Sequence, residues 1–142
     1  MSTLRGGCLC GAVIYQITLP TLWCAHCHCS MCRLSHGAGY VTWFGVADPQ
    51  FRIIEGDDAM AWHQSSPPAQ RAFCKRCGTR LFFRSKRWPG ETHVTLASLH
   101  EPLDRVPESH VFYASHVDWA PVGDALPRHY QSDDPEARAT DH

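Results

Sequence analysis

The sequence predicts a single-domain, mostly β protein with little helix, and three observations support this. Short segments rich in β-branched and aromatic residues recur along the chain and alternate in part with polar residues. Gly, Pro, Ser and Asp separate these segments at intervals typical of all-β domains. No long segment has the 3.6-residue hydrophobic period of an amphipathic helix. With 142 residues and 44% hydrophobic content, the chain is long enough for one core and short for two.

Seven segments are expected to be strands: 12–19, 40–46, 51–56, 59–64, 80–85, 93–99 and 109–115. A short helix is expected after Cys29, where "SMCRLS" follows with a serine cap. Residues 65–70 should form a turn or extended connector, and residues 88–90 a turn. The polar segment 131–142 lacks periodicity, so we expect a disordered tail after a domain of residues 1–130.

Charge and hydropathy narrow the function classes. Thirteen Lys and Arg against fourteen Asp and Glu give a formal net charge of −1. This balance indicates no basic surface for nucleic acid or acidic membranes, so small-molecule or protein partners are favoured. Neither a signal peptide nor an apolar run of about eighteen residues is present, and we expect a cytoplasmic location. Clustered cysteines in a reducing compartment are more often metal ligands or redox groups than disulfides.

The cysteines fall into three groups along the chain: Cys8 and Cys10; Cys24, Cys27, Cys29 and Cys32; and Cys74 and Cys77. Each outlying pair offers two thiolates, whereas a tetrahedral structural zinc needs four, so the two pairs most simply complete each other. Gly11 and Gly78 follow these pairs directly, as suits tight turns that need positive φ. Two alternatives stay open, a redox dithiol at Cys74 and Cys77 and pairs of unrelated buried thiols.

The central group lies in "WCAHCHCSMCR", residues 23–33. Four thiolates there would close a second structural site, whereas three would leave zinc an open position for a substrate. Including Cys24 would place all four ligands in nine consecutive residues, a tight wrap. We therefore favour Cys27, Cys29 and Cys32 as the ligands. A redox role for Cys24 with Cys27 is a third, weaker interpretation.

Three ordered motifs, "GGCLCGAVIY", "CHCSMCR" followed by "SHGAGY", and "FCKRCGTRLF", resemble the glutathione-dependent formaldehyde-activating enzyme (GFA) family, also called the centromere protein V/GFA domain family. The resemblance runs from about Gly6 to Trp119. It implies an Mss4-like antiparallel β fold stapled by zinc, with one structural and one catalytic ion in a domain of residues 1–130. The implied structural ligands are Cys8, Cys10, Cys74 and Cys77, and the implied catalytic ligands are Cys27, Cys29 and Cys32. The family motif does not require a cysteine at position 24.

The family activity is the addition of formaldehyde to the thiol of glutathione, which gives S-hydroxymethylglutathione. The resemblance therefore implies a zinc-dependent carbon–sulfur lyase that acts on an adduct of glutathione, or another small thiol, with an aldehyde. The rival interpretation is a non-catalytic module whose two zinc ions only shape an interaction surface. The number of thiolates at the second site distinguishes the two.

Other candidate residues follow from the expected chemistry. Arg33, directly after Cys32, is the candidate to bind a glutathione carboxylate. A proton must reach the nascent alkoxide, and His36 is a candidate because imidazole titrates near neutral pH. His28 lies between two ligands and is expected to point outward. The ten histidines are not by themselves a sign of a third metal. The larger aromatic residues are expected in the core: Trp43, Phe44, Phe82, Phe83 and Trp119.

Overall fold

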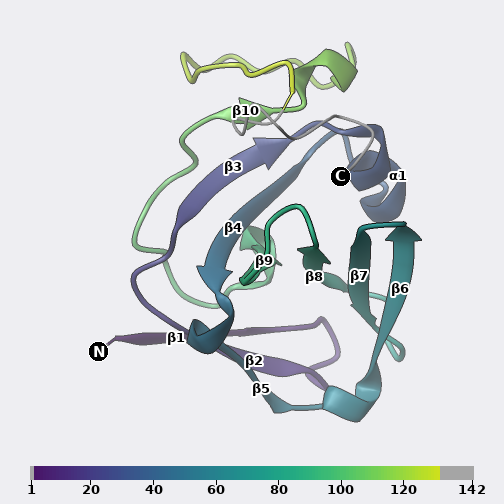
Figure 1. The fold of residues 1–142 in the computed structure, drawn as a ribbon, viewed down its shortest axis with the longest axis vertical. Coiled ribbons are helices and arrows are strands. Elements are labelled where there is room, and N and C mark those ends of the chain that lie inside the picture. The colour runs from purple at the N-terminus through teal and green to yellow at the C-terminus, as the bar shows by residue number, and fades with distance from the viewer. Residues whose placement is uncertain (1, 132–142) are drawn as a thin grey trace.

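A small and a large β-sheet pack against each other in the computed structural model, which describes residues 2–131 (Figure 1). The small sheet has the order β1 (Thr3–Gly7), β2 (Ile14–Thr18), β5 (Phe51–Glu55). The large sheet has the order β10 (His110–Val111), β3 (Trp23–Cys27), β4 (Val41–Ala47), β9 (Glu91–Thr95), β8 (Arg80–Ser85), β7 (Ala69–Cys74), β6 (Met60–Ser66). Neighbouring strands are antiparallel, except that β10 runs parallel to β3.

Helix is scarce in the described part of the chain. It contains one α-helix, α1 (Ser30–His36). Four short 3-10 turns lie elsewhere along the chain: η1 (Asp48–Gln50), η2 (Asp57–Ala59), η3 (Leu96–Ser98) and η4 (Tyr113–Ser115). The predicted mostly β fold is therefore confirmed. None of the helices within residues 2–131 has the length and apolar character needed to cross a membrane. The tail expected over residues 131–142 lies outside the described residues, apart from residue 131.

The sequence prediction missed three strands, β1, β3 and β7. Each is only five or six residues long; β1 ends in two glycines, which strands disfavour, and β3 and β7 lack a clear alternation of apolar and polar residues. The predicted connector over residues 65–70 is shorter than expected, since β6 ends at Ser66 and β7 begins at Ala69. The helix after Cys29 is present, but its N-cap is Cys29 itself and not the serine that follows.

Alternation along the strands of the large sheet separates two cores. Phe82 on β8 and Phe44 on β4 face the small sheet, where Phe82 contacts Tyr15 edge-on with ring centroids 5.1 Å apart. The next residue on β8, Phe83, and the preceding residue on β4, Trp43, belong to a second core on the opposite face. Because side chains alternate along a strand, each sheet position belongs to one core or the other. Four of the five aromatic residues predicted to be core are buried, but Trp119 is 72% exposed, so the prediction for Trp119 was wrong.

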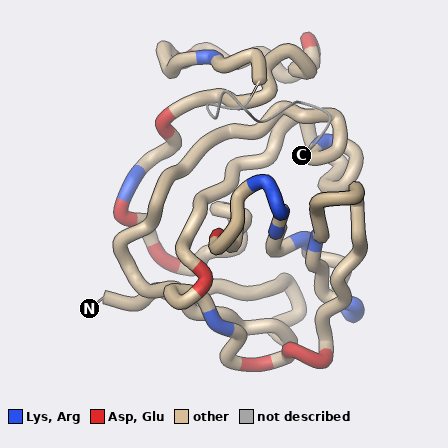
Figure 2. Tube along the Cα trace, viewed as in Figure 1, with Lys and Arg blue, Asp and Glu red and all other residues tan. Residues whose placement is uncertain are grey.

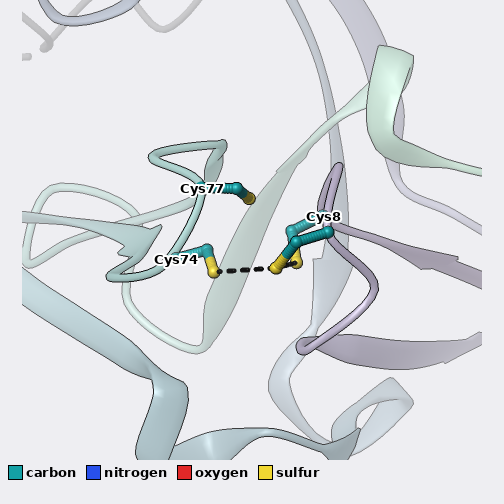
Figure 3. Close-up of side chains that lie close together, drawn as sticks. Cys8, Cys74 and Cys77 are labelled. Carbon is teal, nitrogen blue, oxygen red and sulfur yellow. Dashed lines mark hydrogen bonds between the residues drawn. The ribbon is translucent and has the colours of Figure 1, made fainter.

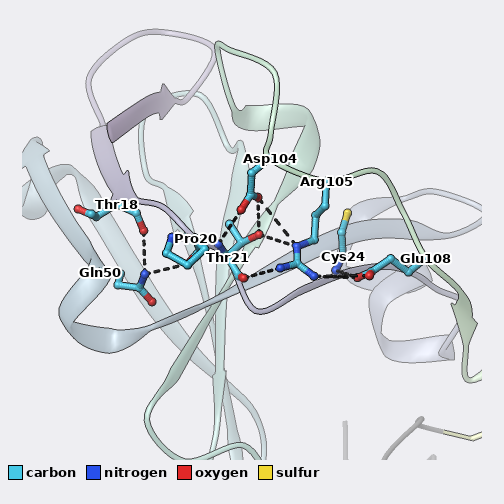
Figure 4. A network of polar contacts seen from close by, with 8 residues as sticks. All are labelled: Thr18, Pro20, Thr21, Cys24, Gln50, Asp104, Arg105 and Glu108. Atoms are coloured by element: carbon cyan, nitrogen blue, oxygen red, sulfur yellow. Dashed lines mark hydrogen bonds and ion pairs between the residues drawn. The ribbon is translucent and has the colours of Figure 1, made fainter. Parts of the chain in front are cut away.

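A polar network fastens the segment before β10 to the start of β3 (Figure 4). The Asp104 carboxylate accepts from the backbone N–H and hydroxyl of Thr21 at 3.0 and 2.6 Å. Arg105 donates to the Thr21 carbonyl at 2.6 Å, and Glu108 accepts from the backbone N–H of Cys24 at 3.1 Å. These bonds fix the path of the chain that brings β10 alongside β3.

Acidic and basic residues are interspersed along the chain trace and do not gather on one side (Figure 2). This arrangement agrees with the balanced charge of the sequence. Charge therefore acts at the candidate site through single side chains and not through a charged patch.

Candidate functional site

Two loops bring the outlying cysteine pairs together (Figure 3). Cys8 and Cys10 lie in the turn from β1 to β2, and Cys74 and Cys77 lie where β7 turns into β8. The four sulfurs all lie within 4.8 Å of one another. Sγ of Cys10 is 3.6 Å from that of Cys8 and 3.8 Å from that of Cys74. We call these residues the four-thiol group.

The two loops share a left-handed glycine directly after the second cysteine. Gly11 and Gly78 both have φ of +79°, and each donates its N–H to the carbonyl of the cysteine three or four residues earlier, Cys8 at 3.1 Å and Cys74 at 2.9 Å. The predicted positive φ is therefore present in both turns. Hydrogen bonds from the side chain and the backbone of Thr79 lower the pKa of Cys77 to about 5, which favours the thiolate that metal ligation needs.

Sulfur spacing provides a test of whether zinc fits. With Zn–S bonds of about 2.3 Å, the sulfurs of a tetrahedral site are about 3.8 Å apart. The measured separations of 3.6 and 3.8 Å match this edge length. Two of the six sulfur separations thus fit a tetrahedral zinc ion, and the four-thiol group is compatible with metal binding. Cys8 and Cys74 are buried, whereas Cys10 is exposed.

The second group gathers Cys27, Cys29 and Cys32, whose sulfurs also lie within 4.8 Å of one another. Cys27 ends β3, Cys29 caps α1 by accepting from the backbone N–H of Cys32 at 3.2 Å, and Cys32 lies in the first turn. Sγ of Cys32 is 3.5 Å from Sγ of Cys27, near the tetrahedral edge for zinc. Burial, together with the neighbouring thiols, raises the pKa of Cys27 well above its ordinary value. We call these residues the three-thiol group.

Cys24 is not part of this group. It packs in the core beneath the small sheet, opposite Phe44 on β4, and is 1% exposed. Cys27 belongs to the core on the other face of the large sheet. A separation of three residues on a strand points two side chains to opposite faces, so Cys24 and Cys27 cannot meet. Burial, and the charge of Glu108, raise the pKa of Cys24 to about 12, as expected for a thiol that serves in packing.

A buried arginine that the sequence analysis missed lies against the three-thiol group. Both terminal nitrogens of Arg71, on β7, are within hydrogen-bonding distance of Sγ of Cys32, at 3.7 and 3.6 Å. Arg71 is 3% exposed, and its guanidinium lies 5.0 Å from the ring centroid of Phe83. A buried cation needs a compensating anion, which Cys32 would supply as a thiolate. Nothing in the spacing of "AQRAFC" indicated this contact.

The histidines near the site differ from the expectation in part. His28 is 1% exposed and not outward-pointing, because its backbone N–H donates to the Val111 carbonyl at 3.0 Å and its ring Nε2 lies 2.8 Å from Nδ1 of His110. His36 packs edge-on against Trp43 with centroids 5.3 Å apart. Burial lowers the pKa of His36 to about 4, so the imidazole is neutral at pH 7.

A groove of about 620 Å³ runs past the end of α1. Its lining includes His36, Arg80, Thr42 and Thr79, which offer one charged side chain and several hydrogen-bonding groups. Arg33, the predicted carboxylate ligand, is half-buried on α1 beside Cys32 and is not among the lining residues of this groove. Its Nε is buried and forms no hydrogen bond within residues 2–131.

Comparison with known proteins identifies the family. Residues 3–115 match the sequence profile of the glutathione-dependent formaldehyde-activating enzymes. The chain belongs to this family, abbreviated GFA. A Halomonas elongata protein named "Putative glutathione-dependent formaldehyde-activating enzyme" is 29% identical to the GFA chain over 126 residues, 84% of this chain and 80% of that protein.

Two further proteins are similar to this chain. An "uncharacterized lyase" of Schizosaccharomyces pombe is 32% identical over 85 residues, 58% of each protein. The crystal structure of a Rhodobacter sphaeroides protein superimposes with a TM-score of 0.61 at 26% identity, covering 73% of this chain and 98% of that one.

Proposed function

We propose that this chain is a zinc-dependent carbon–sulfur lyase that acts on an adduct between glutathione, or another small thiol, and an aldehyde such as formaldehyde. One observation carries the proposal: seven cysteines divide into a four-thiol and a three-thiol group, with Cys24 on the opposite face of β3. Four thiolates complete a tetrahedral zinc, whereas three leave a position for a substrate sulfur. The names of the family and of the relatives support the reaction class.

Two zinc ions per chain are proposed, and each cysteine group would hold one. The structural ligands would be Cys8, Cys10, Cys74 and Cys77, and the catalytic ligands Cys27, Cys29 and Cys32. At the three-thiol group, bound zinc would supply a coordination position that lowers the pKa of the substrate thiol. The four-thiol group would tie the β1–β2 turn to the β7–β8 turn, so its loss should damage folding more than chemistry.

Arg71 would adjust the charge of the catalytic site. Three thiolates and one divalent ion carry a net charge of −1, which disfavours an incoming thiolate. The guanidinium within 3.7 Å of Sγ of Cys32 brings this sum to zero. The site would then accept one further anionic sulfur at a lower electrostatic cost.

Proton balance assigns a role to His36. When the adduct forms, the sulfur–carbon bond is made, the thiol loses its proton and the former carbonyl oxygen gains one. An imidazole can accept the proton from sulfur and return it to oxygen most readily when its pKa lies near the working pH, whereas burial lowers the pKa of His36 to about 4. His36 lies in the groove, and the charge of Cys32 partly offsets burial by raising the pKa of this imidazole toward the range that the transfer needs. Arg80, in the same groove, and Arg33 on α1 are the proposed partners of the glutathione carboxylates.

The test compares Cys29→Ser with Cys24→Ser. The measurements are zinc per chain, thermal stability, and the rate, above the uncatalysed one, at which formaldehyde plus glutathione interconverts with S-hydroxymethylglutathione. Cys29→Ser should lose one zinc and the added rate while it remains folded. Cys24→Ser should keep both zinc ions and the rate. Equal loss of zinc and rate in the two variants would indicate a closed four-thiolate site, and the interaction module would replace the lyase.

A further inference from the structure

A third cluster of potential metal ligands includes the residue that precedes Cys27 on β3. It combines His26 on β3, His110 on β10 and Asp124 on the following loop, and one ligand atom from each lies within 4.8 Å of the others. The parallel pairing of β10 with β3 places His110 directly beside His26. Their rings are 4.8 Å apart between centroids and tilted by 30°. Distant parts of the sequence therefore converge on one point.

In both histidines the ring nitrogen that points away from the cluster has a hydrogen-bond partner. Nδ1 of His26 lies 2.7 Å from the Thr42 hydroxyl, which leaves Nε2 for a ligand. Nδ1 of His110 lies 2.8 Å from Nε2 of His28, so Nε2 of His110 faces the cluster. Histidines that bind metals usually have the second ring nitrogen hydrogen-bonded in this way, which fixes the ring and its tautomer.

The carboxylate is also oriented. Both oxygens of Asp124 lie 3.0 Å from Nε2 of His110, and Oδ1 accepts from the backbone N–H of Leu126 at 3.0 Å. With metal–nitrogen and metal–oxygen bonds of about 2.1 Å, ligands on a tetrahedral ion are about 3.4 Å apart. An ion between His110 and Asp124 therefore needs a separation only a few tenths of an ångström larger than the one present.

Access and burial differ across the cluster. His110 is fully buried, whereas the side chain of Asp124 is 39% exposed. An ion could therefore enter from the solvent side at Asp124, and the buried imidazole would close the opposite side. Two imidazoles and one carboxylate form a nitrogen–oxygen donor set that suits divalent zinc, iron, cobalt or nickel.

We propose that His26, His110 and Asp124 form a third metal site, which binds a divalent first-row transition ion and is separate from the two cysteine groups. Two imidazoles and one carboxylate leave at least one position for water or a small ligand. His28 connects the two neighbourhoods, because it touches His110 and stands in sequence between Cys27 and Cys29. The site therefore adds a nitrogen–oxygen centre to the two proposed sulfur centres.

Cobalt distinguishes this site from the cysteine groups. The tag-free full chain, loaded with zinc, is dialysed against excess Co²⁺, and bound cobalt and retained zinc are counted. One cobalt per chain should bind without displacing zinc, and it should lack the sulfur-to-cobalt charge-transfer absorption that thiolate sites show. Asp124→Asn should weaken this binding roughly tenfold or more, because it replaces a charged ligand with a neutral one. Asp118→Asn, at a fully exposed carboxylate on the same loop region, is the matched control and should bind cobalt as the wild type does.

A second variant protects the test against misfolding. His26→Asn removes a ligand from β3 and leaves the Asp124 loop unchanged, and circular dichroism with zinc counts verifies that each variant is folded. The proposal is overturned if the wild type takes up no cobalt beyond exchange with zinc. It is equally overturned if folded Asp124→Asn and His26→Asn both retain the additional ion, since the cluster would then be only a hydrogen-bonded pair.

Discussion

Replacing Arg71 with methionine removes the buried charge beside the three-thiol group and keeps most of the apolar stem. At 3.6 Å, two unit charges attract by about 4–5 kcal/mol at an effective dielectric constant of 20, an upper limit for the pair. Relaxation reduces this figure, and partners that support metal ligands typically change metal affinity by about 10–100-fold. We therefore expect Arg71→Met to weaken zinc binding at the three-thiol group by about 10–100-fold.

The assay is zinc competition against a calibrated chelator, resolved into two equivalents per chain. Arg71→Lys should lie between wild type and Arg71→Met, since lysine keeps the charge but loses the planar fork. Arg52→Met, at an exposed position in the small sheet, is the control and should change neither equivalent. If Arg71→Met binds both zinc ions within twofold of wild type, the guanidinium does not stabilise the thiolates and the charge argument fails.

Three further predictions follow from the fold and the sites. A Cβ at Gly56 would collide with the Ala12 carbonyl, so Gly56→Ala should lower the free energy of unfolding by about 3 kcal/mol or more. Gly90 has a similar positive φ but open space around it, so the control Gly90→Ala should lower that free energy by only about 1–2 kcal/mol. Equal losses in the two variants would contradict the steric argument. Burial alone would raise the pKa of Asp104, but hydrogen bonds from Thr21 hold it below its usual value. The ionised carboxylate therefore stabilises the fold fully at pH values above the unfolded-state pKa of about 3.9. This stabilisation is lost as the pH falls through the pKa of the folded state. Asp104→Asn should therefore cost about 1–2 kcal/mol at pH 7, and its difference from wild type, measured by denaturant unfolding, should shrink only below about pH 4; a difference that vanishes by pH 6 would refute this. In equilibrium competition with a chelator, the three-thiol group should lose zinc first with the fold retained, and simultaneous loss of both ions with unfolding would contradict the two-site assignment.

Spacing alone predicted which of the outlying cysteines meet, because pairs one or two residues apart are local features. The two outlying pairs meet as expected, and both following glycines have the positive φ that such turns need. The position of Cys24 could not be fixed in the same way, because β3 itself was not predicted. Once β3 is known, alternation alone sends Cys24 and Cys27 to opposite faces.

Long-range contacts explain the remaining failures. Arg71 reaches Cys32 across 39 positions, and His28 is buried by a parallel strand 82 positions later in the sequence. Parallel pairing of a two-residue strand leaves almost no periodic signal. The same pairing brings His26, His110 and Asp124 together, so the count of histidines carried no information about this cluster before the topology was known.

Cadmium-113 NMR of the cadmium-substituted chain tests the central claim most directly, because the chemical shift of each ion reports the number of thiolates bound to it. The account predicts one resonance from a four-thiolate site and a second from a three-thiolate site. Added glutathione should move only the second resonance toward the position of a four-thiolate site, and S-methylglutathione, which has no thiol, should leave both unchanged. Two four-thiolate resonances before any addition, or no response of the second to glutathione, would contradict an open catalytic site.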